Sequence, residues 1–315
     1  MNPLVKVLSP EFLERAKKIF PPGQINSILK SYTLQKPTTF RINSLKTTER
    51  TVISYLEKHK IAFLPEKSIP LCYYLTKISQ KKLEQLPLYE EGSIYLQNTS
   101  SQLPPIILNP EPHENVLDLC ASPGSKTTQL AALMHNAGAI AAIEPDAIRF
   151  ERLKHNVDQL GCNIVSCHHS SGEKFIKNYL SCENPPLFDK ILVDAPCSGD
   201  GTFYVHRKNT FAYWNLAFVE KLSKIQKRLL TAAIKVLKPG GELVYSTCSV
   251  SPEENECVID HVIKSLPVKT VAIKHSWLKP ALSSWQNSSF DRQIINSRRI
   301  YPSSQSEGFF ITKLK

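Results

Sequence analysis

Clustered cysteines are the first feature that this sequence lacks. Its 315 residues include eight cysteines, at positions 72, 120, 162, 167, 182, 197, 248 and 257, and they form no paired C-x-x-C clusters. A disulfide scaffold needs a denser set and a structural zinc site needs paired ligands, so the sequence favours neither. Several of these cysteines lie in apolar runs, as reduced thiols do. We therefore expect no metal site and a reducing, cytoplasmic compartment.

Long apolar runs are also missing. No run approaches the roughly 18 residues of a membrane-spanning helix, and the first 20 residues lack the apolar core of a signal peptide. The sequence contains no internal repeat and no low-complexity tract. We expect a cytoplasmic monomer with no membrane partner, because no feature demands a second subunit.

Negative charge is in short supply. The chain has 39 Lys and Arg residues against 28 Asp and Glu, which gives a net charge of +11. A surplus of this size favours a polyanionic partner such as nucleic acid. Generic solubility charge produces the same excess, so composition alone does not identify the partner.

The pattern of the chain changes near residue 110, at the proline-rich segment NPEPHEN, where proline interrupts regular structure. Short helical patterns mix with turns and one strand before this point. After it, strands alternate with helices, which predicts an α/β fold with a doubly wound, mainly parallel sheet. We expect a smaller α+β domain at 1–110 and the sheet domain at 111–315, with strands at 115–120, 139–144, 164–167, 188–194 and 242–247.

Ligands of such a sheet bind at the edge where the parallel strands end. We expect the loops that follow the strands to converge at this edge, and they span residues 120–126, 144–146, 194–201 and 247–252.

The first of these loops has the features of a ligand-binding turn. In VLDLCASPGSKT a strand leads through a Pro-Gly turn to a helix start. The free N–H groups of that helix can cradle a phosphate or the carboxylate of an amino-acid cofactor. The spacing GxxxxGK[ST] of a nucleotide phosphate loop is absent. The candidate cofactor-binding residues of this loop are Cys120, Ala121, Ser122, Pro123, Gly124, Ser125 and Lys126.

Glu144 ends the next predicted strand. A carboxylate at this position can accept hydrogen bonds from both hydroxyls of a ribose. The alternative is a solvated acid before the helix that begins at Asp146. The spacing between the loop and the acid favours the ribose interpretation.

Two further loops carry an aspartate and two cysteines. FDKILVDAPCSGDGT places Asp194 and Cys197 just after a strand, and GGELVYSTCSVSPEEN places Cys248 just after another. A single cysteine at such a position is usually a small buried apolar group. Two thiols and an acid on loops that meet beside a cofactor loop are harder to explain by packing, so we expect them to be catalytic.

Methylation of cytosine at carbon 5 is a reaction that needs these residue types. A thiolate that adds at carbon 6 makes carbon 5 carbanion-like, so it can accept a methyl group from a sulfonium, and the thiolate then leaves. A cysteine thiol has an ordinary pKa of about 8.5, so it needs activation at neutral pH. Asp194 can hydrogen-bond the cytosine amino group and ring nitrogen, which rejects uracil.

These motifs resemble the Sun-type RNA (cytosine-5) methyltransferases. The resemblance runs from PTTFRINSL, near residue 37, to EGFFITKLK at the end. It is strongest in DLCASPGSKT, in DAPCSGDGT and in LLTAAIKVLKPGGELVYSTCSVSPEEN. The bacterial small-subunit rRNA branch is the most similar. The resemblance implies a class I, Rossmann-like fold, S-adenosylmethionine as the cofactor and RNA as the partner, with rRNA favoured over tRNA.

The resemblance also implies residue roles. Cys248 corresponds to the nucleophile, and Cys197 to the cysteine that aids release of the methylated product. Asp194, the 120–126 loop and Glu144 correspond to cofactor contacts, and Arg149 either supports Glu144 or faces solvent. The segment 111–315 would be the methyltransferase domain, and 1–110 an accessory domain that binds RNA.

The chain departs from the family pattern in two places. Ser171, before Gly172, stands where an acid usually contacts the cofactor adenine, and a hydroxyl bonds more weakly than a carboxylate. YVHRKNTFAYW is less regular than the family's basic stretch. We still expect RNA contacts from this stretch and from the N-terminal region, at Arg41, His206, Arg207 and Lys208.

Three alternatives remain open from the sequence. A DNA cytosine-5 methyltransferase would use Cys197 as the nucleophile and leave Cys248 dispensable. A non-catalytic RNA-binding assembly factor would need neither thiol. A nitrogen methyltransferase needs an Asn-Pro-Pro-Tyr motif, where this chain has Asp194-Ala-Pro-Cys197.

Overall fold

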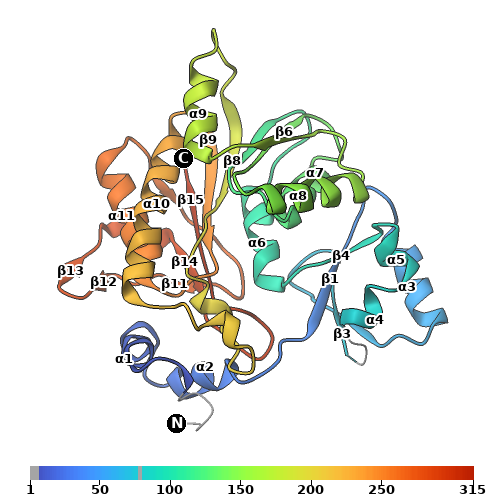
Figure 1. Cartoon of the computed structure of the whole chain (residues 1–315), viewed down its shortest axis with the longest axis horizontal. Coiled ribbons are helices and arrows are strands. Elements are labelled where there is room, and N and C mark those ends of the chain that lie inside the picture. The colour runs from blue at the N-terminus through green and yellow to red at the C-terminus, as the bar shows by residue number, and fades with distance from the viewer. Residues whose placement is uncertain (1–6, 77–79) are drawn as a thin grey trace. The chain divides into compact units, whose positions relative to one another are not determined.

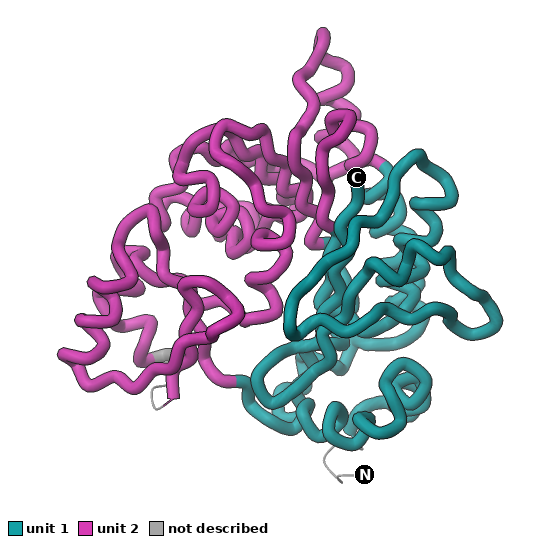
Figure 2. Tube along the Cα trace, turned by 180° about the vertical axis from the view of Figure 1, so that it is seen from behind, with its two compact units in different colours: residues 1–36, 195–231, 245–315 teal, residues 37–194, 232–244 magenta. Residues whose placement is uncertain are grey.

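The computed structural model describes residues 7–76 and 80–315 (Figure 1), and the chain divides into two compact units (Figure 2). Unit 1 comprises residues 1–36, 195–231 and 245–315, and unit 2 comprises residues 37–194 and 232–244. The predicted boundary near residue 110 stays a prediction, because these units interleave along the chain.

Unit 2 contains the predicted parallel sheet. Strands β5 (Asn115–Asp118), β6 (Ala139–Glu144), β7 (Val165–His169) and β8 (Phe188–Asp194) lie in the order β8-β5-β6-β7, and each neighbouring pair is parallel. Helices α7 (Ser125–Leu133), α8 (Ala147–Gln159) and α9 (Gly172–Leu180) connect them. This arrangement confirms the predicted α/β fold of the Rossmann-like, class I kind. It also places the ends of these four strands at one edge of the sheet.

Local sequence explains where these elements begin. The centre of β8 is a continuous apolar run in which Ile191, Leu192 and Val193 are fully buried, as expected of a strand covered on both faces. Helix α8 begins after Asp146, whose side chain accepts from Arg149 N, and α9 begins after Ser171 in the same way. Both residues are typical N-caps.

Unit 2 also contains a small antiparallel sheet (Figure 1). Its strands are β1 (Thr38–Ile42), β2 (Phe63–Pro65), β3 (Cys72–Leu75) and β4 (Ile94–Leu96), in the order β2-β3-β1-β4. Helix α3 (Glu49–Lys58) packs Val52 and Leu56 into a core that includes Phe40 and Ile42. The remaining helices of this region are α4 (Gln80–Leu83), α5 (Pro87–Glu90) and α6 (Thr99–Leu108).

Unit 1 combines segments that are far apart in the sequence. Its helices are α1 (Pro10–Ile19), α2 (Ile25–Ser31), α11 (Glu256–Ser265) and most of α10 (Leu216–Ile234). Phe12 of α1 packs its ring 5.0 Å from that of Phe203 and 5.3 Å from that of Trp214. The N-terminal helices therefore share a core with the segment that follows Cys197.

The strands of unit 1 are mostly short. β15 (Phe309–Leu314) pairs antiparallel with β14 (Arg298–Ile300) and β10 (Thr270–Val271), and β14 pairs with β11 (Lys279–Pro280). β12 (Ser284–Trp285) and β13 (Ser288–Ser289) form a hairpin. Strand β9 (Leu237–Thr247) begins in unit 2 and ends in unit 1. Unit 1 also contains 3-10 helices at Asp200–Thr202, Lys208–Thr210, Pro252–Glu254 and Arg292–Asn296.

Within the part of the chain that the structure describes, no helix combines the length and the apolar character needed to cross a membrane.

Candidate active site

Two thiols meet in unit 1. The Sγ atoms of Cys197 and Cys248 lie 3.2 Å apart, and both residues are free and partly exposed. Cys197 lies in the loop after β8, and Cys248 follows the last residue of β9. The sequence predicted that these two loops meet, and the structure brings their thiols into direct contact.

The contact raises the pKa of the Cys197 thiol. A hydrogen bond with Cys248 and burial together raise the pKa of Cys197 well above its ordinary value. Cys197 therefore remains a thiol near neutral pH and can donate its proton toward Cys248 Sγ.

Asp200 holds the loop after Cys248. Its carboxylate is fully buried and accepts from Val250 N at 2.6 Å, from Ser251 Oγ at 2.6 Å and from Trp214 Nε1 at 3.1 Å. Gly201 N also donates to the carbonyl oxygen of Cys248 at 3.0 Å. These contacts fix the loop that carries the second thiol.

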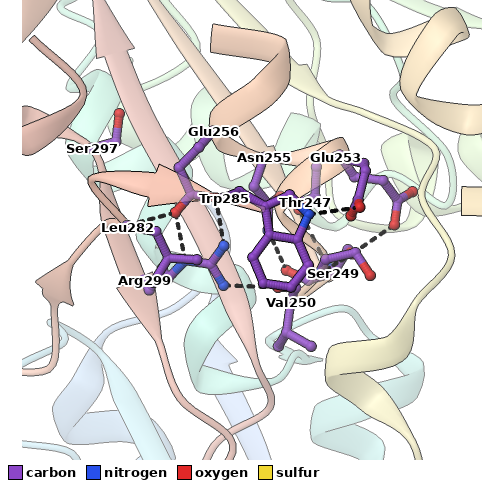
Figure 3. A network of polar contacts seen from close by, with 12 residues as sticks. Thr247, Ser249, Val250, Glu253, Asn255, Glu256, Leu282, Trp285, Ser297 and Arg299 are labelled. Carbon is purple, nitrogen blue, oxygen red and sulfur yellow. Dashed lines mark hydrogen bonds and ion pairs between the residues drawn. The ribbon is translucent and has the colours of Figure 1, made fainter. Parts of the chain in front are cut away.

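A second buried network supports the same loop (Figure 3). Thr247 Oγ1 donates to Asn255 Oδ1 at 2.6 Å, and Asn255 Nδ2 donates to the carbonyl of Ser249 at 2.9 Å. Arg299 donates to Glu256 Oε1 at 2.6 Å and to the carbonyl of Val250 at 2.8 Å. The backbone on both sides of Cys248 is therefore held by side chains.

The predicted cofactor loop joins β5 to α7 in unit 2. Gly124 precedes α7 with a φ of 101°, a conformation that suits glycine, and the Ser122–Pro123 peptide is cis. Lys126, in the first turn of α7, is buried rather than exposed. Its Nζ lies 2.6 Å from Asp194 Oδ2 and 2.9 Å from Ser101 Oγ. Two predicted site residues, Lys126 and Asp194, thus form an ion pair.

Sequence reasoning missed Asp118. This residue ends β5 and is 1% exposed. Its Oδ2 accepts from Thr127 Oγ1 at 2.7 Å, whereas its Oδ1 has no hydrogen-bond partner among the described residues. Burial raises the pKa of Asp118 to about 6. An acid at the end of an apolar strand was the available signal, and an unpaired buried oxygen there suits a cationic ligand group.

Glu144 is 2% exposed, so it is not the solvated acid of the alternative interpretation. Its Oε1 accepts from Asp146 N at 2.9 Å, and its Oε2 lies 3.4 Å from an Arg149 nitrogen. Arg149 also donates to the carbonyl of Ser122 at 3.1 Å. Arg149 therefore links Glu144 to the cofactor loop, and the spare lone pairs of the carboxylate suit paired hydroxyl groups.

The remaining residues of the predicted cofactor loop differ in exposure. Ala121 and Ser122 are buried, Cys120 and Ser125 are half-buried, and Pro123 is exposed. Burial and nearby carboxylates raise the pKa of Cys120 well above its ordinary value, so this thiol stays neutral. Ser171 is half-buried, and its Oγ accepts from Lys174 N at 3.3 Å.

The predicted RNA contacts lie in different surroundings. Arg41 is only 4% exposed and donates to Gln97 Oε1 and Thr128 Oγ1, and burial lowers its pKa to about 10. His206, Arg207 and Lys208 are exposed on unit 1. The hydrogen bonds of Arg41 to Gln97 and Thr128 explain its position without RNA. The exposed residues 206–208 are accessible to a polyanion.

The described residues contain no group of three or more His, Cys, Asp and Glu side chains arranged to hold a metal ion.

Comparison with known proteins gives one family. The model of a family described as 16S rRNA methyltransferase RsmB/F matches residues 105–315. The chain is 37% identical over 289 residues to the tRNA (cytosine(49)-C(5))-methyltransferase of Pyrococcus abyssi, covering 90% of this chain and 89% of that protein. It is 32% identical over 310 residues to the 28S rRNA (cytosine-C(5))-methyltransferase of Mus musculus, covering 96% of this chain and 38% of that protein.

Solved structures agree. A methyltransferase homolog protein from Pyrococcus horikoshii superimposes with a TM-score of 0.80 at 34% identity, covering 98% of this chain and 99% of that one. The mammalian relatives are much longer, and the chain spans only about two fifths of their length.

Proposed function

Because this chain belongs to the 16S rRNA methyltransferase RsmB/F family, we propose that it transfers a methyl group from S-adenosylmethionine to carbon 5 of a cytidine in RNA. The observation that carries the proposal is the 3.2 Å contact between Cys197 and Cys248. Ribosomal RNA is the first substrate to test, since the family description names 16S rRNA.

Cys248 is the proposed nucleophile. Its thiolate adds to carbon 6 of the cytosine, and the electron pair of the 5,6 double bond then makes carbon 5 nucleophilic. The thiol of Cys197 lies 3.2 Å away and can donate a hydrogen bond to the Cys248 sulfur. After methylation a solvent base takes the carbon-5 proton, the electron pair of that C–H bond re-forms the 5,6 double bond, and the Cys248–carbon 6 bond breaks with its electron pair on the departing thiolate. Cys197 is the residue that we assign to this release.

Asp194 is the proposed base-recognition residue. Its carboxylate can accept from the cytosine amino group, a donor that uracil lacks. The ammonium group of Lys126 lies 2.6 Å from Asp194 Oδ2 and keeps the carboxylate in one orientation. Lys126, which the sequence placed only among the cofactor contacts, thus gains a second role in holding Asp194.

The residues of unit 2 fit S-adenosylmethionine, which when bound supplies the methyl group as an electrophilic sulfonium. The unpaired Oδ1 of Asp118 suits the ammonium group of its methionine part, and the N-terminus of α7 suits the carboxylate. Glu144 suits the ribose hydroxyls. The hydroxyl of Ser171 accepts the N-cap hydrogen bond and retains its own proton for an adenine nitrogen.

Transfer RNA is a second candidate substrate. The relative from Pyrococcus abyssi is named for cytosine 49 of tRNA and is matched over 89% of its length. Reaching carbon 6 requires an unstacked base, so a loop or a single-stranded segment is the expected target in either RNA.

The experiment mixes purified protein and labelled S-adenosylmethionine with size-fractionated total RNA, or in parallel with duplex DNA, from a strain that lacks this gene. Wild type is compared with Cys248→Ala and Cys197→Ala, 5-methylcytidine is mapped, and covalent protein–RNA adducts are resolved on denaturing gels. We expect Cys248→Ala to abolish methylation and Cys197→Ala to accumulate the adduct.

Three results would contradict the proposal. Methylation by Cys248→Ala but not by Cys197→Ala would make Cys197 the nucleophile, as in a DNA-type enzyme. Methyl transfer to duplex DNA in preference to RNA would make DNA the substrate. No transfer to any RNA fraction by wild type would favour a non-catalytic assembly factor.

A further inference from the structure

One buried carboxylate contacts the chain directly after each catalytic cysteine. Glu254 ends the 3-10 helix Pro252–Glu254 and is fully buried. Its Oε1 accepts from Ser198 N at 2.8 Å, and its Oε2 accepts from Ser198 Oγ at 2.5 Å and from Ser249 Oγ at 2.6 Å. Ser198 follows Cys197 and Ser249 follows Cys248, so a single side chain bonds both thiol-bearing loops.

Gln226 of α10 adds a second link between Glu254 and the Cys197 loop. Its Nε2 donates to Glu254 Oε1 at 3.0 Å and to the carbonyl of Pro196 at 2.9 Å. The segment from Pro196 to Ser198 is thus held at both ends, with Cys197 between the two contacts. The same carboxylate holds the Cys248 loop through Ser249.

We propose that Glu254 is a positioning residue that sets the distance between the Cys197 and Cys248 thiols by hydrogen-bonding the loop of each. The expected effect on catalysis rests on the proposed function. The expected effect on the distance between the two thiols rests on the contacts of Glu254 alone. The hydrogen bonds of Glu254 go to the serines that follow the two cysteines, so it acts on the sulfurs through the two loops.

The chemistry of the contacts explains why this residue is an acid. Four donors converge on two oxygens: the N–H and hydroxyl of Ser198, the hydroxyl of Ser249 and the amide of Gln226. Above the pKa of Glu254, which burial raises to about 7, the ionised carboxylate accepts all four, whereas an amide has only one accepting oxygen, so wild type and variant are compared above that pKa. Ser249 Oγ already accepts from Ser251 N at 3.0 Å, so it is poorly placed to accept from an amide as well.

Glu254→Gln is therefore a conservative change that should separate the loops while it keeps the shape of the side chain. Glu253→Gln is a matched control. Glu253 is the neighbouring acid, but its side chain bonds Arg15 and Trp285 and neither cysteine loop. Ser249→Ala is a milder second variant, because it removes only one of the four donors to Glu254, the one on the Cys248 loop, together with the acceptor of Ser251 N.

The first measurement needs neither RNA nor S-adenosylmethionine. Phenylarsine oxide condenses with two nearby thiols to form two As–S bonds and one water, so it reports whether the sulfurs are adjacent. We would measure its binding by intact mass and peptide mapping, with Cys197→Ala as the blank. We expect wild type and Glu253→Gln to be bridged across Cys197 and Cys248. Glu254→Gln should be bridged about tenfold more weakly, with Ser249→Ala between them.

The second measurement determines kcat and KM separately. A positioning role predicts that Glu254→Gln lowers kcat by about tenfold or more while KM for RNA and for S-adenosylmethionine stays within about twofold. Normal circular dichroism and thermal unfolding would show that the variant is folded. If Glu254→Gln did not fold, Ser249→Ala would carry the same comparison.

The outcomes separate this inference from the proposed function. Unchanged arsenical bridging in folded Glu254→Gln and in Ser249→Ala would overturn the positioning role, whatever the methylation assay gave. An equal loss in Glu253→Gln would also overturn it, because the effect would then be general to this segment. Weakened bridging in a protein that methylates no RNA would support the inference and contradict the proposed function.

Discussion

At the residue scale, four buried acids lie in or beside the candidate active site. Asp118, Asp200, Glu144 and Glu254 are each 2% exposed or less. A buried carboxylate is costly unless donors satisfy it. Asp200 and Glu254 accept hydrogen bonds from donors of unit 1 and hold its loops. Asp118 keeps one oxygen without a hydrogen-bond partner among the described residues, which we assign to the ammonium group of the proposed ligand.

Asp118→Asn should weaken binding of S-adenosylmethionine by about 10- to 100-fold. The substitution removes one charged partner of the ligand ammonium group, and hydrogen bonds to charged groups contribute about 1.5–3 kcal/mol. Isothermal titration calorimetry without RNA measures the effect directly. Asp158→Asn, an exposed acid on α8, is the control and should bind as wild type does. Equal affinities for wild type and Asp118→Asn would show that Asp118 has no contact with the ligand.

The free energy of unfolding should vary with pH because of the titration of Glu254. Burial and the nearby Asp200 raise its pKa from 4.5 to about 7. The folded state then holds this proton more tightly than the unfolded chain does. The stability from this group is fully present below pH 4.5 and is lost as the pH rises through 7.

The corresponding measurement is urea unfolding of wild type and Glu254→Gln from about pH 5 to about pH 8, a range that spans the shift. The free energy of unfolding of wild type, relative to the variant, should fall as the pH rises. A constant difference across this range would show that Glu254 does not titrate there.

At the scale of elements, the loop after Cys197 approaches the loop of Cys248 closely at Gly201. Gly201 lies where a Cβ atom would be 2.5 Å from the carbonyl oxygen of Gly308 and 2.6 Å from that of Cys248. Both are backbone atoms, so neither can rotate away. The loop after Cys197 therefore needs glycine at this position in order to contact the loop of Cys248.

Gly201→Ala should displace the Cys248 backbone, lower kcat strongly and cost about 1–3 kcal/mol of stability, as overpacking usually does. Gly23→Ala is the matched control, because a Cβ atom at Gly23 would meet no heavy atom within 4 Å and its φ is not positive. Methylation rates and thermal unfolding of the two variants give the comparison. Wild-type activity in Gly201→Ala would mean that the contact between these loops is not needed.

At the scale of the whole molecule, the net charge of +11 favours encounter with a polyanion such as the proposed RNA substrate. Affinity for RNA should therefore fall steeply with salt, because binding releases counterions from the phosphates. Exposed residues of the 206–208 segment are the proposed phosphate contacts.

Arg207→Gln together with Lys208→Gln should weaken RNA binding similarly for different sequences. The slope of log affinity against log salt should decrease by about 1 for each residue removed. Fluorescence anisotropy at several salt concentrations measures it. Lys264→Gln, which removes an exposed cation already paired with Asp260, should leave the slope near that of wild type. An unchanged slope in the double variant would place the phosphate contacts elsewhere.

The sequence by itself determined the parallel sheet and the candidate residues on its loops. Alternating apolar strands and helices follow from short-range periodicity, and Asp194, Cys197 and Cys248 stand at or directly after strand ends. The predicted helix start at Asp146 follows from local capping. Family resemblance then assigned roles to these residues, and those roles stay predictions until the variants are measured.

Only the tertiary structure decided which groups touch. Ser198 and Glu254 are 56 residues apart in the sequence, and Lys126 and Asp194 are 68 apart. No periodicity encodes such pairs, because they depend on how separate elements pack. The same holds for the burial of Arg41, for the unpaired oxygen of Asp118 and for the N-terminal helices that share a core with the Cys197 segment. Local physics sets the elements and their loops, whereas long-range packing sets the distances on which the chemistry depends.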